Sequence, residues 1–327
     1  MPPKTPPFQA SSAKKAETQR PFWGKHLLEG GLAEDIRHRA EVARLDLERL
    51  KERVAFSPFL EIGAGSGQRS ITLMQHFAAQ GVATDVSQNV LQNALFSSVL
   101  LKAQAMPLLV CCDAHHLPFL ANTFRFVFTY RTLHHFDNPV PVAAECYRVL
   151  GQGGHFFFNE EPMDSPLRRL LRGQRMVSSP PTRWQRLARR LGVLKIFWDD
   201  GAWERSVGIT EARFDRSLWV EALRPFEKVE AEINRKLRIV SDLHRPLIQA
   251  QLSGIVGGNV KGLCQKLSGE PASEDFQERL MCLDCQATGL QRISAQGMQC
   301  AACGRIYPIH LGVMRMLPLA LEAELYG

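Results

Sequence analysis

The stretch FLEIGAGSG, from Phe59 to Gly67, decides the fold. A short apolar run leads into a turn with glycine at positions 63, 65 and 67, and a helical segment follows. Glycine at these positions lets the backbone turn tightly and approach a ligand that any Cβ would push away. A dinucleotide fingerprint, GxGxxG, would need glycine at position 68, where Gln68 stands. The stretch therefore predicts a strand, a glycine turn and a helix, with the acidic Glu61 inside the strand.

Short apolar runs alternate with helical segments along the chain on the C-terminal side of this turn. The candidate strands are residues 59–62, 81–86, 108–112, 124–130 and 155–158, followed by two more near 226–233 and 253–264. Helices are expected at 69–79, 87–102 and 217–223, and apolar residues three and four apart predict another over 36–54. This alternation predicts an α/β protein with a parallel, doubly wound, Rossmann-like sheet.

Carboxylates stand where the next two strands of the predicted sheet end. Asp85 lies 18 residues after Gly67, where its carboxylate can accept both hydroxyls of a ribose. Asp113 and Ala114 follow the third strand, where a carboxylate and a backbone amide can bind the edge of an adenine. Three acidic residues, with no cluster of basic residues around the turn, suit a cationic nucleoside without phosphate. S-adenosylmethionine fits this description better than NAD does.

Five motifs in order resemble those of class I S-adenosylmethionine-dependent methyltransferases of the type 11 group. They are EIGAGSG (61–67), TDVS (84–87), DAHHLPF (113–119), FRFVFTYRTLHHF (124–136) and ECYRVLGQGG (145–154). The resemblance implies a seven-stranded sheet whose last strand is antiparallel, with the cofactor lying across the C-terminal strand ends. It also implies that Glu61 holds the methionyl amino group, Asp85 the ribose, and Asp113 with Ala114 the adenine. Arg125 departs from the family, which usually has Asp there. The predicted cofactor-binding residues are Glu61, Gly63, Ala64, Gly65, Gly67, Asp85, Val86, Asp113, Ala114 and Tyr130.

The residues that follow the fourth strand indicate which kind of atom accepts the methyl group. Methyl transfer from a sulfonium requires alignment of donor and acceptor and, for a hydroxyl acceptor, removal of a proton. Enzymes that methylate amide or base nitrogens typically carry an Asn/Asp-Pro-Pro-Tyr turn where this chain has Thr129-Tyr130-Arg131-Thr132, and no Pro-Cys nucleophile is present for cytosine carbon. The candidate bases are His134, His135, Glu160 and Glu161, of which His134 and Glu161 are the predicted catalytic pair. The histidines could instead pack against the cofactor, and the glutamates could be solvated or pair with a lid.

These features predict methyl transfer to an oxygen of a small, sugar-linked or lipid-linked metabolite. An RNA methyltransferase is the alternative, and a cofactor-binding scaffold without catalysis is a second one.

Residues 163–212 interrupt the alternation of strands and helices and predict an inserted helical lid. Between Met163 and Lys195 there are nine Arg or Lys residues and one acid, a local charge of +8, so the net charge of +7 leaves about −1 for the rest of the chain. The segment could be a pair of solvated amphipathic helices, a lid that binds an anion on the acceptor, or an RNA contact.

Two CxxC pairs near the C-terminus predict a structural zinc site. Cys282 and Cys285 are separated by 14 residues from Cys300 and Cys303. Two such turns facing each other supply four thiolates, which complete a tetrahedral Zn²⁺ site and leave no position for substrate. The residues that follow, from Gly304 to Leu317, resemble the small zinc-ribbon activator subunit of tRNA, rRNA and release-factor methyltransferases. That resemblance implies a ribbon that docks on a methyltransferase, here in the same chain.

The predicted organisation divides the chain into six parts. These are a disordered tail (1–25), N-terminal cap helices (26–55), a cofactor-binding core (56–162), the lid (163–212), the remainder of the core (213–268) and the zinc ribbon (277–318). The first twenty residues lack the apolar centre of a secretory signal, and no uninterrupted apolar stretch is long enough to span a bilayer. We therefore expect a cytoplasmic protein with reduced thiols and no transmembrane segment.

Overall fold

The computed structural model describes residues 32–164, 212–234, 241–242 and 258–326. The helices are α2 (Leu32–Glu48), α3 (Gln68–Phe77), α4 (Gln88–Gln92), α5 (Ala94–Leu100), η1 (Leu133–His135, a 3₁₀ turn), α6 (Val140–Val149), α10 (Arg216–Leu223) and α12 (Leu319–Tyr326). The strands are β1 (Phe59–Ile62), β2 (Gly81–Asp85), β3 (Leu108–Cys111), β4 (Phe124–Tyr130), β5 (Leu150–Met163), β6 (Lys228–Asn234), β7 (Ser241–Asp242), β8 (Gly258–Gln265), β9 (Leu290–Ser294), β10 (Gly297–Cys300), β11 (Ile306–His310) and β12 (Val313–Arg315). Most of the predicted strands and helices are present with ends shifted by one or two residues. The strand predicted at 155–158 is the middle of the longer β5, the helix predicted at 87–102 is divided into α4 and α5, and the helix predicted at 36–54 begins at Leu32 and ends at Glu48.

The central part of the sheet has the strand order β3-β2-β1-β4-β5-β8-β6. The first five of these strands are parallel, whereas β8 runs antiparallel between β5 and β6. The order of the parallel strands reverses at β1, which has β2 on one side and β4 on the other. In open α/β sheets a ligand binds at such a switch point, outside the carboxyl ends of the strands. The turn from Gly63 to Gly67 lies at this position because it directly follows β1.

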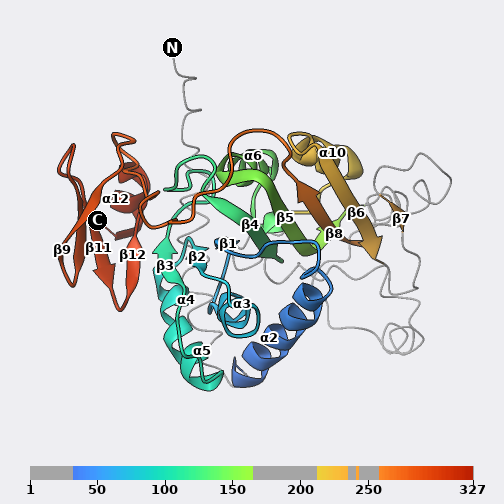
Figure 1. Ribbon diagram of the computed structural model, residues 1–327, viewed down its shortest axis with the longest axis horizontal. Coiled ribbons are helices and arrows are strands. Elements are labelled where there is room, and N and C mark those ends of the chain that lie inside the picture. Colours follow the sequence, from blue (N-terminus) through green and yellow to red (C-terminus); the bar gives the residue numbers. More distant parts are fainter. Residues whose placement is uncertain (1–31, 165–211, 235–240, 243–257, 327) are drawn as a thin grey trace, which may run out of the picture.

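Helices cover both faces of this sheet, as Figure 1 shows, with α2 to α5 on one side and α6 and α10 on the other. Alternate residues of β4 serve the two sides. Phe126 and Phe128 pack with residues of α2 and α3, and Val127 packs with residues of α6 and α10. The alternation follows from the two-residue period of a strand, and strands buried on both faces read as continuous apolar runs.

The sheet does not end at seven strands, which corrects the predicted count. The described sheet has twelve strands, because β12, β11, β10 and β9 continue it beyond β3 and β7 pairs with β6 at the other edge. Strand β12 pairs parallel to β3, with Val313 opposite Leu109 and Arg315 opposite Cys111. The free edge of β3 would otherwise expose unpaired backbone donors and acceptors, and β12 satisfies them. The C-terminal strands therefore join the core by main-chain hydrogen bonds within one chain.

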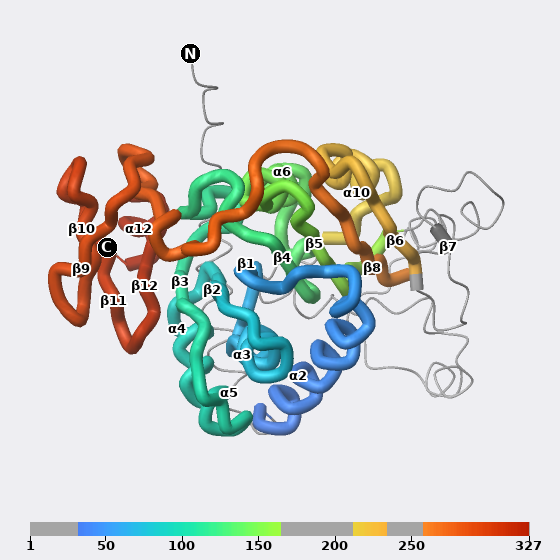
Figure 2. Tube along the Cα trace, in the orientation of Figure 1, coloured from blue at the N-terminus to red at the C-terminus, as the bar shows by residue number. Residues whose placement is uncertain are grey.

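The connection from β8 to the C-terminal strands crosses the sheet, as the tube in Figure 2 shows. Isolated β-bridges between Gln152 and Pro271 and between Phe119 and Leu280 attach this connection to the core. The chain ends in α12, where Leu321 and Leu325 pack with Ala64 of the glycine turn and with Ala83 of β2. The C-terminal helix thus forms part of the core beside the turn.

Several predicted features lie outside the described residues. They are the N-terminal tail, the start of the cap region and almost all of the lid, including its arginines. Within the part of the chain that is described, no helix combines the length and the apolar character needed to cross a bilayer.

Candidate cofactor and metal sites

The glycine turn contains one position that packing reserves for glycine and one that opens onto free space. Gly63 and Gly65 both have positive φ, at 67° and 57°. A Cβ on Gly63 would lie 2.4 Å from the side chain of Thr132, whereas a Cβ on Gly65 would meet no atom within 4 Å. Thr132 follows β4, so β4 closes the turn from one side. The open space beside Gly65 is where a ligand could lie against the backbone.

Glu61 is completely buried at the end of β1. Its Oε2 accepts hydrogen bonds from the backbone amide of Ser70, at 3.1 Å, and from the Ser70 hydroxyl, at 2.6 Å. Its Oε1 is buried and has no hydrogen-bond partner. Burial raises the pKa of Glu61 to about 7, although Arg69 and Ser70 favour the charged form. Because a buried acceptor without a partner is costly, this oxygen is suited to receive a donor from a ligand.

Asp85 orders the glycine turn from the end of β2. Its Oδ2 accepts a hydrogen bond from the amide of Gly65, at 3.1 Å, and its Oδ1 accepts one from Ser87, at 2.9 Å. Burial raises the pKa of Asp85, and these amides oppose the shift. The neighbouring amide of Ala64 donates to the carbonyl of Thr84, and Val86 packs partly buried beside it. Asp85, the residue predicted to bind the ribose, is thus held half-buried next to the glycine turn.

Asp113 is engaged by the turn that follows it. His115 donates to Asp113 Oδ1 from its backbone amide at 3.0 Å, and its ring Nδ1 lies 2.8 Å from the same oxygen. The ring of His116 lies 3.4 Å from Oδ2. Burial alone would raise the pKa of Asp113, but these histidine contacts outweigh it and lower the pKa. The adjacent Ala114 is buried in the main core.

Tyr130 points toward α2. Its ring packs in the cluster with Phe128 and Phe157, and its hydroxyl lies 3.4 Å from Asp46 Oδ2 of α2. The guanidinium of Arg69 lies over the ring, 4.5 Å from its centroid. Tyr130 therefore contacts Arg69 through the face of its ring and Asp46 through its hydroxyl.

His134 and Glu161 form a buried pair at the ends of β4 and β5. The ring Nδ1 of His134 lies 2.8 Å from Glu161 Oε2. The same carboxylate accepts the backbone amides of Thr132, Leu133 and His134 at 2.7–3.1 Å, so it caps the 3₁₀ turn η1. Burial would raise the pKa of Glu161, but the hydrogen bond from His134 and the backbone amides lower it. Glu161 is therefore an ionised group that orients the His134 ring by accepting a hydrogen bond from its Nδ1.

A β-bulge gives this pair its geometry. Strand β5 shifts register between Phe158 and Glu161, and Glu160 within the shift has a φ of 61°. In a regular strand, residues two apart share a face, but an extra residue changes the direction of those beyond it. Asn159 accordingly donates to Asp46 of α2, at 2.7 Å, while Glu161 reaches η1. Of the other two candidate bases, His135 has its ring tilted against that of His134, with ring centroids 4.2 Å apart, and Glu160 is only partly buried.

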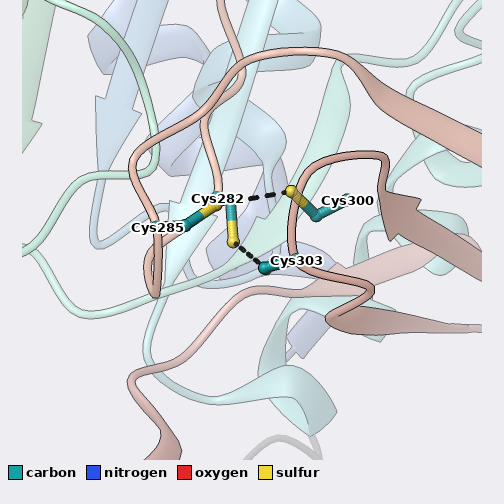
Figure 3. A group of neighbouring side chains, drawn as sticks. All are labelled: Cys282, Cys285, Cys300 and Cys303. Carbon is teal, nitrogen blue, oxygen red and sulfur yellow. Dashed lines mark hydrogen bonds between the residues drawn. The ribbon is translucent and has the colours of Figure 1, made fainter.

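The four predicted zinc ligands come together in space. Their Sγ atoms all lie within 4.8 Å of one another, and Figure 3 shows the side chains of the two CxxC turns converging. The Sγ atoms of Cys282 and Cys303 are 3.5 Å apart, and those of Cys285 and Cys300 are 3.6 Å apart. A disulfide would need about 2.0 Å. Zinc–sulfur bonds of about 2.3 Å in a tetrahedron place the sulfurs roughly 3.8 Å apart, so the cluster fits one zinc ion.

One protein family matches the central part of this chain, which includes the glycine turn. Residues 60–158 match the family described as "Methyltransferase domain". The central segment of this chain matches the methyltransferase-domain family. The match covers the glycine turn, Asp85, Asp113 and His134, and it ends before Glu161. The comparison with curated protein sequences found no match.

Solved structures resemble this chain only distantly. The complex of the Haloferax volcanii Trm112 methyltransferase activator with a putative methyltransferase matches with 14% identity and a TM-score of 0.46, over 75% of this chain and 98% of the other. A possible histamine N-methyltransferase from Thermotoga maritima matches with 16% identity and a TM-score of 0.42, over 77% and 98%. Geranyl diphosphate C-methyltransferase from Streptomyces coelicolor A3(2) matches with 12% identity and a TM-score of 0.48, over 80% and 100%. Likenesses this weak identify neither the acceptor nor a partner.

The sequence analysis missed the residues that support the glycine turn. Ser70, which binds Glu61, and Arg69, which lies beside it, stand in the first turn of α3, while Thr132 fills the space over Gly63. A hydroxyl residue in the first turn after the glycines was the available signal for Ser70. Nothing local marks Thr132, because it reaches Gly63 only through the pairing of β1 with β4.

Proposed function

We propose that this chain is an S-adenosylmethionine-dependent methyltransferase. The observation that carries the proposal is the buried Glu61 carboxylate, whose Oε1 lacks a partner beside a glycine turn that is open at Gly65. The cofactor carries an electrophilic methyl group on a sulfonium, and its α-amino group supplies the donor that Oε1 lacks. Asp85 would bind the ribose, and the segment at Asp113 and Ala114 would bind the adenine. Gly67, Ala64 and Val86 would shape the floor of this site.

We further propose that His134 is the general base and that Glu161 orients it. Glu161 lies in a fully buried, hydrogen-bonded position and holds the proton of the histidine on Nδ1. In the neutral form of this ring the lone pair would be on Nε2, which would take a proton from an acceptor hydroxyl. A residue in this role suits an oxygen acceptor, and we propose a small, sugar-linked or lipid-linked metabolite. Glu161 is a positioning residue in this scheme, since its own oxygens are occupied.

The four cysteines would hold one structural zinc ion. With four thiolates bound, no position on the metal remains for substrate, so its chemistry here is to hold the two turns together. Tyr307 supports the cluster, because its hydroxyl lies 3.2 Å from Cys282 Sγ and accepts the amide of Leu283 at 2.8 Å. The ribbon would therefore stabilise the edge of the sheet and take no part in methyl transfer.

Calorimetry with S-adenosylhomocysteine and NAD tests the cofactor. We expect S-adenosylhomocysteine to bind, and Asp85→Ala to weaken it by about 1–3 kcal/mol through lost charge-assisted hydrogen bonds. A preference for NAD would refute the proposal.

The acceptor is tested by comparing small-molecule extracts and RNA from cells with and without the protein, by mass spectrometry, for a product heavier by one methylene. A new methylated metabolite is expected. A mark confined to RNA would favour the alternative acceptor, and cofactor binding with no methylated product in either fraction would indicate a non-catalytic scaffold.

A further inference from the structure

Arg69 is a buried arginine with unused hydrogen-bonding capacity. Its side chain is 6% exposed, and no side-chain hydrogen bond joins it to any residue that the structure describes. Its Nε is buried without a partner. The nearest carboxylate oxygen is Glu61 Oε1, which lies 3.9 Å from Arg69 Nη1 and also lacks a hydrogen-bond partner. A buried guanidinium has five donors to satisfy, so an arrangement of this kind is costly unless something else binds there.

Contact with the Tyr130 ring holds the Arg69 side chain in position. Its guanidinium lies over the ring of Tyr130, and cation–π attraction favours that placement. Tyr130 is in turn held against Asp46 of α2, which accepts hydrogen bonds from Lys261 Nζ at 2.8 Å and from Asn159. The network fixes the ring and leaves the donors of Arg69 unsatisfied. A side chain maintained in this way is prepared for an anionic ligand group.

We propose that Arg69 binds the α-carboxylate of the methionine part of the cofactor while Glu61 Oε1 accepts its α-amino group. This inference rests on the proposed function, because it assigns a further part of the same ligand. An α-amino acid carries a cation and an anion on one carbon atom, which matches a carboxylate oxygen and a guanidinium that lie side by side without a hydrogen bond between them. Tyr130 acts through Arg69 as a positioning residue. The site therefore selects ligands with an intact amino acid.

An anion on the acceptor is the competing ligand for Arg69. The partnerless Glu61 Oε1 beside it favours the amino acid, because a ligand that carries an ammonium group and a carboxylate on one carbon atom satisfies both groups at once. Kinetics with the acceptor are therefore not needed to test the assignment, and binding of the cofactor alone decides it.

The experiment compares S-adenosylmethionine with decarboxylated S-adenosylmethionine, which keeps the amino group and lacks the carboxylate. Calorimetry on the full chain is done with wild type, Arg69→Met, Arg69→Lys and the control Arg44→Met. Arg44 is a suitable control because its guanidinium pairs at the surface with Glu41. We expect wild type to prefer the intact cofactor by roughly 10- to 100-fold, the range of a charge-assisted, bidentate hydrogen bond.

Arg69→Met should abolish that preference by weakening the intact cofactor alone, Arg69→Lys should keep part of it, and Arg44→Met should keep all of it. The melting temperature of each variant is measured alongside, because Arg69→Met also takes away the cation nearest to the buried Glu61 carboxylate. Tyr130→Leu should lower the preference and Tyr130→Phe should keep it, since only the ring is needed under the guanidinium.

Equal weakening of both ligands by Arg69→Met, or a wild type without preference, would overturn the assignment of Arg69. A wild type that binds neither ligand would instead refute the proposed function.

Discussion

The glycine turn allows a sharp test, because Gly63 and Gly65 share a backbone conformation and differ in their surroundings. Both have positive φ, so alanine at either position costs about 1–2 kcal/mol in backbone strain. Only at Gly63 would the new Cβ overlap another side chain, lying 2.4 Å from Thr132 Cγ2 and Oγ1. Overpacking of this kind typically adds about 1–3 kcal/mol. We therefore expect Gly63→Ala to cost about 2–5 kcal/mol of stability and Gly65→Ala about 1–2 kcal/mol.

Cofactor binding should show the converse selectivity. Gly65→Ala puts a methyl group into the open space beside the turn, so the affinity for S-adenosylhomocysteine should fall by more than about tenfold while the fold persists. Unfolding in denaturant, followed by circular dichroism, measures the stability of each variant, and calorimetry measures binding.

The double variant Gly63→Ala/Thr132→Ala is the matched control. It removes the two atoms that overlap most and should recover part of the stability lost in Gly63→Ala. The remaining deficit should still exceed that of Gly65→Ala, because the Cβ of residue 132 would lie 2.9 Å from the new Cβ. Equal destabilisation by the two single variants would refute the overlap with Thr132, and unchanged binding in Gly65→Ala would refute close approach of the cofactor at that position.

Three further predictions concern the rest of the chain. Glu61 has a folded pKa of about 7 against an ordinary value of 4.5, so the folded chain without ligand holds the Glu61 proton more tightly than the unfolded chain does. This preference stabilises the fold fully below about pH 4.5 and is lost as the pH rises through 7. Because the ionised form receives the ligand's ammonium, S-adenosylhomocysteine should bind about tenfold more tightly at pH 8 than at pH 6, and in Glu61→Gln calorimetry should show that dependence flattened. Elemental analysis should find one zinc per chain, lost when the four cluster cysteines are changed to Ser and retained in Cys264→Ala, and a folded wild type without metal would contradict this. Leu321→Ala should destabilise the chain by about 2–5 kcal/mol, because Leu321 is 1% exposed. The control Leu319→Ala, at a residue 58% exposed, should change stability by less than about 0.5 kcal/mol. Equal effects of the two variants in thermal unfolding would contradict the docking of α12.

The parts of the site that the sequence predicts are those within single strands and turns. The glycines after β1, the carboxylates at strand ends and the two CxxC pairs are local patterns, because each motif's chemistry depends on spacing along the chain. The structure brings the four sulfurs together as the spacing predicts. The predicted lid falls outside the described residues, so its arginines remain a prediction.

Contacts between distant segments escaped prediction because no local pattern records them. Thr132 excludes a side chain at Gly63 only because β4 lies beside β1, and the bulge at Glu160 redirects Glu161 to η1 with no mark in the sequence. The twelve-stranded sheet exceeds the predicted seven strands because a backbone edge accepts any strand that can reach it, whatever its side chains.

The sequence by itself determined the α/β class, the glycine turn, the order of the strand-end acids and the four-cysteine cluster. All of these depend on periodicity and short-range spacing. Tertiary structure alone decided that Glu61 and Arg69 face each other without a hydrogen bond, that Tyr130 lies beneath Arg69, and that β12 completes the edge of β3. Burial and pairing are properties of the packed chain, because each depends on which distant residues exclude water from a given atom.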